Sequence, residues 1–177
     1  RNPATSSWSV LPDLGPALVA ADGGRDAGHE GTALVAVVGT EDGPGEVGAR
    51  AALEALGLDA GVVLATFEPR TTAGWLTTVP LPPGEHAVRR VVLVGVADGS
   101  DAAWRTAAAA VGRATRGRTR VIHAVGASAS AGALTAYVEA AVLASWGSPR
   151  WTRKGPTVVT HPASDAVVTG TEDAVAV

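Results

Sequence analysis

The amino-acid sequence predicts an α/β fold, a mostly parallel sheet with helices on both faces. The runs from Thr32 to Gly39 and from Arg89 to Val96 are almost continuously apolar and rich in β-branched residues, which is typical of strands buried on both faces. Segments with helical spacing follow both runs. The connections are long enough for crossovers, and strands that alternate with helices in this way favour parallel pairing.

The chain before residue 31 is expected to be loosely ordered. It contains several prolines and a glycine-rich turn, and its one apolar stretch, Leu14 to Ala21, allows at most a short strand. The first predicted strand is therefore Thr32 to Gly39. Val47 to Leu56 follows as a helix, and Gly57 is expected to end it, because glycine readily adopts the left-handed conformation found just after helices.

Three more strands are predicted before residue 100. Val62 to Phe67 and Trp75 to Leu81 are both apolar, and the turn-forming residues between them would let the two pair as a hairpin. The run Arg89 to Val96 is flanked by turn residues on both sides. We expect this run to lie in the middle of the sheet, because it has almost no polar side chain to expose.

The second half of the chain is expected to hold two helices with a strand between them. Asp98 or Ser100 can cap the first helix. Helical spacing predicts that the core side of this helix consists of Trp104, Ala108, Val111 and Thr115. Its solvent side is predicted to consist of Arg105, Arg113 and Arg116. Arg120 to Val125 is predicted as a buried strand. Ser130 to Trp146 is predicted as a helix with so little polar surface that it should lie between the sheet and another element.

The last residues are predicted as a loop, a strand and the start of a helix. These elements are expected at Trp146 to Lys154, at Thr157 to Thr160 and from Asp165 onward. We therefore predict one domain over residues 31–163, a loose segment at 1–30, and the beginning of a linking helix at 164–177. The sequence opens on Arg1 rather than Met, which suggests trimming or excision from a longer protein.

Composition favours a soluble protein. There is no run of eighteen apolar residues and no signal peptide, so neither a membrane span nor a leader is predicted. Cysteine is absent, which excludes disulfides and thiolate chemistry and fits a reducing compartment. We expect a cytoplasmic location.

Charge is unevenly distributed although the net charge is only −3. Residues 102–163 carry eight basic side chains and one acidic side chain, a basic block that suits nucleic acid, an acidic partner subunit or simply a solvated face. Three tryptophans lie within this block. Helical spacing places Trp104 in the core, and we interpret Trp146 and Trp151 as interface residues.

No catalytic constellation is present in the sequence pattern. None of the four histidines has the spacing of a metal-binding pair, and they are His29, His86, His123 and His161. His123 lies within a predicted strand and is expected to be packed in the core. Ser128 and Ser130 lack the second glycine of a Gly-x-Ser-x-Gly turn, so we interpret them as helix caps rather than nucleophiles.

The glycine-rich and acidic loops are interpreted as turns. The loop from Gly39 to Gly45 follows a strand, but its acidic pair Glu41–Asp42 would repel a phosphate, and Gly95 to Gly99 lacks the dinucleotide-binding spacing. The pairs Glu41–Asp42 and Glu172–Asp173 fit a solvated loop and a first helical turn better than an acid–base pair. The sequence therefore offers no catalytic, cofactor-binding or metal-binding residue.

Four segments, in their order and spacing, resemble the N-terminal domain of the leucyl (cytosol) aminopeptidase family. They are Gly74 to Leu81, Arg89 to Val96, Trp104 to Val111, and Ala140 to Trp146 leading to Arg153 and Lys154. The resemblance covers most of residues 32–177. Glu172 to Val177 resembles the start of the helix that links this domain to the catalytic domain of the family.

The resemblance implies a macro-domain-like three-layer sandwich attached to a C-terminal catalytic domain, which binds two divalent metals (Zn or Mn) and removes N-terminal residues from peptides. The chain itself would act in assembly and active-site access, with the catalytic domain and neighbouring subunits of a homo-oligomer, a hexamer, as its partners. The family's metal- and bicarbonate-binding motif, Asn-Thr-Asp-Ala-Glu-Gly-Arg, has no counterpart here. No site residue is carried over, and the chain alone is not expected to be an enzyme.

Two other functions stay open. A macro-like fold would suit a stand-alone module that binds a nucleotide or ADP-ribose, although the acidic loop after the first strand argues against this. The basic block at 102–163 would suit a nucleic-acid-binding domain, whose affinity should fall steeply with salt, although the net negative charge argues against that function.

Overall fold

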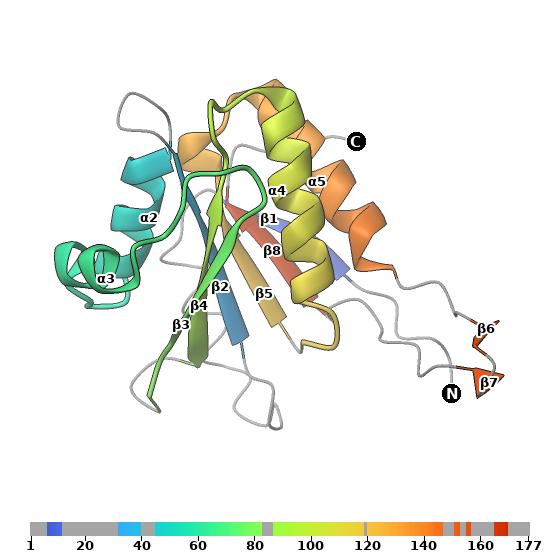
Figure 1. Cartoon of the computed structure of the whole chain (residues 1–177), viewed down its shortest axis with the longest axis horizontal. Helices are drawn as coiled ribbons and strands as arrows, with labels where there is room; N and C mark the ends of the chain where they lie inside the picture. The colour runs from blue at the N-terminus through green and yellow to red at the C-terminus, as the bar shows by residue number, and fades with distance from the viewer. Residues whose placement is uncertain are drawn as a thin grey trace.

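The fold is a three-layer α/β sandwich, as the sequence predicts (Figure 1). The structure is a computed structural model that describes residues 7–11, 32–39, 45–82, 87–118, 120–146, 151–152, 155–156 and 165–169. Within these residues a six-stranded sheet has helices on both of its faces. The predicted fold class is therefore confirmed.

The sheet has the strand order β1-β8-β5-β2-β4-β3, and every neighbouring pair is parallel except β3 with β4. The strands are β1 (Ser7–Leu11), β2 (Thr32–Val38), β3 (Leu76–Pro80), β4 (Val88–Gly95), β5 (Arg120–Ala124) and β8 (Asp165–Thr169). The predicted strands that correspond to β2, β3, β4 and β5 are confirmed. β4 has neighbours on both sides, as expected, although β3 next to it is the edge of the sheet.

The helices form two separate layers. On one face lies α2 (Gly45–Glu54) with α3 (Ala60–Phe67) beside it, and on the other lie α4 (Asp101–Ala114) and α5 (Ala131–Ser145) (Figure 1). A 3₁₀ turn, η1 (Gly126–Ser128), connects β5 to α5. A small antiparallel pair, β6 (Trp151–Thr152) with β7 (Gly155–Pro156), stands apart from the main sheet.

β2 divides the core into two clusters because its side chains alternate between the two faces. Leu34, Ala36 and Val38 pack in the cluster under α2, whereas Val35 and Val37 pack in the cluster under α4 and α5. All seven residues of β2 are buried. This two-sided burial explains why the strand is apolar at every position from Ala33 to Val38 rather than at every second one.

The prediction for residues 62–67 was wrong, because they form helix α3 and not a strand. A short apolar run does not by itself distinguish a strand from a helix, so the flanking residues decide. Asp59 caps the helix by accepting a hydrogen bond from the backbone N–H of Val62 at 3.0 Å, and Glu68 ends it in the left-handed region at φ 42°. The predicted hairpin with Trp75 to Leu81 therefore does not form, and β3 pairs with β4 instead.

The prediction of a helix from Asp165 onward was also wrong. Residues Asp165–Thr169 form β8, which lies between β1 and β5 and is parallel to both. The residues from Asp165 onward have the pattern of a helix start, but Val167 and Val168 favour a strand once two neighbouring strands offer backbone partners. The described parts of segments 1–30 and 164–177 thus supply two strands of the sheet, while the stretch Leu14 to Ala21 lies outside the described residues.

The predicted caps of the two long helices are largely confirmed. Ser100 accepts a hydrogen bond from the N–H of Ala103 at 3.3 Å, and Ser130 accepts one from the N–H of Ala133 at 3.2 Å. Gly57 follows α2 at φ 71°, in the left-handed conformation expected of a glycine after a helix. The strand expected at Thr157 to Thr160 lies outside the described residues.

Helices α4 and α5 touch through a glycine. A Cβ atom added to Gly112 would lie 2.5 Å from the carbonyl oxygen of Ala141 and 3.2 Å from the backbone N of Ser145. No side chain fits there, because both obstacles belong to the backbone of the facing helix. The distance between the two helices is therefore set by the absence of a side chain at position 112.

We predict that Gly112→Ala destabilises the protein by about 1–3 kcal/mol, because α4 and α5 must separate to admit the methyl group. Urea unfolding monitored by tryptophan fluorescence measures the change. Gly132→Ala in the first turn of α5 is the matched control, since a Cβ there meets nothing within 4 Å. The control should be neutral or stabilising by up to about 1 kcal/mol. Equal unfolding midpoints for the two variants would contradict the assigned role of Gly112.

Candidate functional site

The carboxyl edge of the parallel strands is where this fold class would place a ligand. The chain leaves β2 through α2 on one face of the sheet and leaves β5 through α5 on the other, so the crossovers diverge at the neighbouring strands β2 and β5. The described part of this edge consists of the end of β2, the turn from Gly95 to Ser100, and η1. It is the candidate site.

The turn between β4 and α4 uses its polar groups within the protein. The N–H of Val96 donates to the carbonyl oxygen of Val38 at 3.0 Å, and the N–H of Ala97 donates to that of Thr71 at 2.7 Å. Asp98 accepts from the N–H of Ser100 at 3.1 Å, and this hydrogen bond lowers the pKa of its carboxyl group. These contacts fix the start of α4 and leave Asp98 as a turn residue rather than a general acid or base.

Ser128 is not the helix cap that the sequence suggested. It ends η1 and is buried, and no hydrogen-bond partner of its hydroxyl group is found in the described part of the chain. Its Oγ lies against Gly48 in the first turn of α2, where no Cβ would fit. Ser128 therefore faces the α2 layer, whereas His123 belongs to the α4–α5 layer. The two do not form a nucleophile–base pair.

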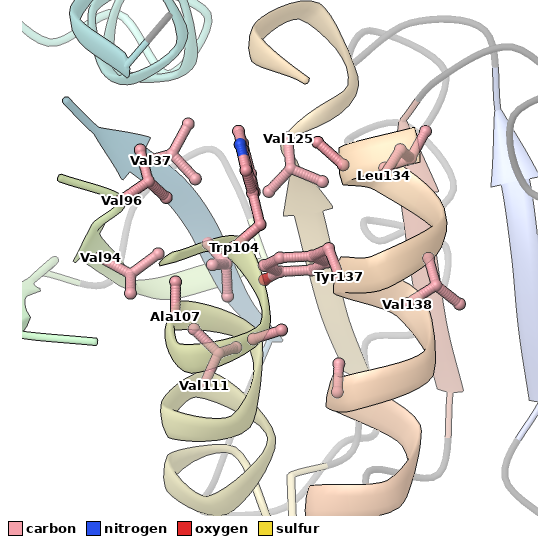
Figure 2. Packing of buried hydrophobic residues seen from close by; sticks show 14 of the residues in the cluster. Val37, Val94, Val96, Trp104, Ala107, Val111, Val125, Leu134, Tyr137 and Val138 are labelled. Carbon is pink, nitrogen blue, oxygen red and sulfur yellow. The ribbon is translucent and has the colours of Figure 1, made fainter. Parts of the chain in front are cut away.

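His123 is a core residue, as expected from its place within a strand. It is 2% exposed, and its Nδ1 lies 3.0 Å from the hydroxyl group of Tyr137, which reaches it from α5. Tyr137 also meets the indole ring of Trp104 edge to face, at 5.9 Å between ring centroids (Figure 2). Burial lowers the pKa of His123 to about 3 and raises that of Tyr137. A histidine that stays neutral and enclosed cannot exchange protons with a substrate.

No group of three or more His, Cys, Asp or Glu side chains in the described residues is placed to hold a metal ion. His29, His86 and His161 lie outside those residues, as do the pairs Glu41–Asp42 and Glu172–Asp173.

One arginine of the basic block, Arg116, caps the carboxyl end of helix α5. Arg116, expected on the solvent side of α4, instead turns its guanidinium to the last carbonyl groups of α5. Its Nε donates to Ser145 O at 3.1 Å, and Nη2 donates to Trp146 O at 3.1 Å and to Ala144 O. A cation at the carboxyl end of a helix also offsets the partial negative charge there. Arg105 and Arg113 are exposed, as predicted.

Trp104 is a core residue, as its helical spacing predicts, whereas the interface role of Trp146 stays a prediction. Trp104 is 1% exposed and lies between α4, α5 and the sheet (Figure 2). Trp146 is 59% exposed, next to Leu143 at 77%, so the carboxyl end of α5 presents apolar surface. Trp151 lies in β6, and its side chain is outside the described part. None of the helices within the described residues has the length and apolar character needed to cross a membrane.

No protein-family model matches this sequence, and no curated protein matches it by sequence. Similar folds occur among solved structures. A tomato leucine aminopeptidase mutant has a TM-score of 0.55 and 15% identity over 96% of this chain and 33% of its own. Two structures of the bottromycin maturation enzyme BotP have TM-scores of 0.48, for its complex with Mn, and 0.47, each at 18% identity, over 80% of this chain and 26% or 27% of their own. This chain therefore spans about a third of the length of the tomato enzyme, with which it shares the fold.

The burial of His123 predicts a pH dependence of stability. His123 takes up a proton near pH 6.5 in the unfolded chain and only near pH 3 in the folded chain, so the unfolded state binds more protons between these pH values. The free energy of unfolding should therefore fall as the pH is lowered through this window, by up to about 1.4 kcal/mol per pH unit. Urea unfolding at a series of pH values measures the slope.

The paired substitution His123→Phe with Tyr137→Phe is the control, because it removes both polar partners and leaves neither unsatisfied. Between pH 3 and 6.5, the free energy of unfolding of this double variant should change less steeply with pH than that of the wild type, because the proton uptake by His123 is missing. Identical slopes would show that His123 is not the group responsible.

Loss of the Arg116 guanidinium should weaken the contact between α4 and α5. We expect Arg116→Ala to lower the free energy of unfolding by about 1–3 kcal/mol, because it removes hydrogen bonds from a charged donor to three carbonyl groups. Arg105→Ala, on the exposed side of the same helix, should change it by no more than about 0.5 kcal/mol. Thermal unfolding of both variants, and of Arg116→Lys as a partial rescue, checks this role.

Proposed function

We propose that this chain is the non-catalytic N-terminal domain of a leucyl-aminopeptidase-like, two-metal exopeptidase. The whole protein would remove N-terminal residues from peptides, and this domain would act in assembly and in access to the active site. The observation that carries the proposal is the shared fold: 96% of this chain matches one third of a leucine aminopeptidase. The four sequence segments that resemble the N-terminal domain of that family support the same assignment.

The chemistry of the described residues agrees with a domain that does not catalyse. The hydroxyl group of Ser128 and the imidazole of His123 belong to different layers of the sandwich, and Asp98 is held by its own turn. The two divalent metals, Zn or Mn, would be held by a separate catalytic domain. Nothing in the described part of this chain is placed to ligate them.

The surface offers candidate contacts for such a role. The carboxyl end of α5 exposes Leu143 and, three residues later, Trp146, at a helix end that Arg116 holds in place. Large exposed apolar side chains on a fixed element are typical of contacts with other protein surfaces. We propose the catalytic domain and neighbouring subunits of a cytoplasmic homo-oligomer, a hexamer, as the partners.

The test compares this 177-residue chain with the complete product of the gene that encodes it. We expect the complete protein to hydrolyse a leucyl amide, to lose activity on treatment with a chelator and to regain it with Mn²⁺ or Zn²⁺. The 177-residue chain should show no hydrolysis under any of these conditions.

Circular dichroism of the 177-residue chain is the control, because an inactive chain is informative only if it is folded. A complete protein that stays inert with both metals, or a gene product no longer than this chain, would overturn the proposal. Hydrolysis by the 177-residue chain itself would overturn the non-catalytic assignment.

A further inference from the structure

We propose that strand β3 pairs with the same strand of a second copy of this chain, antiparallel and across a two-fold axis at Thr78, so that the two six-stranded sheets join edge to edge. The inference concerns association of the chain itself and does not depend on the proposed function. It rests on the hydrogen-bonding register of β3 and on the side chains along its outer edge.

β3 is an edge strand with one neighbour. Figure 1 shows it beside β4, and among the described strands it pairs with no other. The backbone groups on the outer side of such a strand are a template for another strand, and proteins commonly block this pairing with charged side chains, proline or a very short strand. The sequence of β3, Leu76-Thr77-Thr78-Val79-Pro80, contains no charged residue, and its one proline is the last residue of the strand.

The register identifies which backbone groups point outward. Two backbone hydrogen bonds with β4, from Gly95 N–H to Trp75 O at 3.0 Å and from Leu81 N–H to Arg89 O at 3.0 Å, involve odd-numbered residues of this segment. In an antiparallel pair, hydrogen-bonded positions alternate along the strand. The outward backbone groups of β3 are therefore those of Leu76, Thr78 and Pro80.

These outward groups are complementary to themselves. With the axis at Thr78, the N–H of Thr78 donates to the carbonyl oxygen of Thr78 of the partner subunit, and the reciprocal bond forms by symmetry. The N–H of Leu76 donates to the carbonyl oxygen of Pro80 of the partner subunit. Proline has no N–H, and in this register Pro80 only accepts a hydrogen bond through its carbonyl oxygen. Every residue of β3 then faces a residue of the partner strand, and no outward N–H of the strand is unused.

The side chains suit the same register. Thr78 is exposed, and threonine pairs across strands are favourable. At the ends of the strand, Trp75 comes opposite Leu81 of the partner subunit. Trp75 is 46% exposed, and its ring is held from one side by the Arg70 guanidinium, 4.3 Å from the ring centroid. An aromatic side chain opposite an aliphatic one adds apolar contact at both ends of the joint.

A single cysteine tests the proposal directly, because the natural chain has none. Facing residues of a hydrogen-bonded antiparallel pair have Cα atoms about 5.5 Å apart, which is within disulfide range. We expect Thr78→Cys to form a covalent dimer under mild oxidation. The control variants Thr77→Cys and Arg105→Cys should form a covalent dimer at least about tenfold more slowly. Residue 77 lies off the two-fold axis, and residue 105 is exposed on α4.

Sedimentation of the unmodified chain over a concentration series supplies the second measurement. Thr78→Pro removes the outward N–H without removing a bond to β4, and should weaken the dimer at least about tenfold. Thr78→Val keeps the N–H and removes only the threonine pair, so it should weaken the dimer by no more than about fivefold. Thermal unfolding confirms that both variants are folded. A wild type that stays monomeric throughout, equal cross-linking at positions 78 and 105, or faster cross-linking at position 77 would each overturn the proposal.

Discussion

The fold depends on the burial of β2 on both faces at once. Because its neighbours β4 and β5 hydrogen-bond to it from either side, the three strands form a continuous apolar partition between two helical layers. Each layer gains its stability from apolar area removed from water against this partition. A polar residue in the middle of β2 would be buried whichever face it occupied, which accounts for the uninterrupted apolar pattern from Ala33 to Val38.

In the α4–α5 layer, specific contacts hold the two helices to each other and to the sheet. Gly112 brings the helices into backbone contact, Arg116 joins their carboxyl ends, and Tyr137 reaches across to His123 while its ring meets Trp104. These contacts use the polar groups of the layer within the protein itself. These contacts hold α4 and α5 in one arrangement on their face of the sheet.

Two surfaces within the described residues differ in kind. The carboxyl end of α5 exposes side chains, whereas β3 has a described neighbouring strand on one side only. Side-chain surfaces can serve partners of many shapes, but a strand edge accepts only an extended segment in a defined register. Both surfaces lie on elements held by the core, so neither needs reordering before contact.

The sequence alone determined the sandwich, the central strands β2 and β4, the amphipathic phase of α4 and the core position of Trp104, because continuous apolar runs and helical spacing depend only on local order. It did not determine α3 or β8. The apolar run from Val62 to Phe67 suits a helix and a strand equally, and Asp165 to Thr169 becomes a strand only because β1 and β5 stand on either side of it. The partners of Arg116 and of His123 were likewise decided by the tertiary structure. A contact across 29 residues, as between Arg116 and Ser145, exists only once the two helices lie side by side.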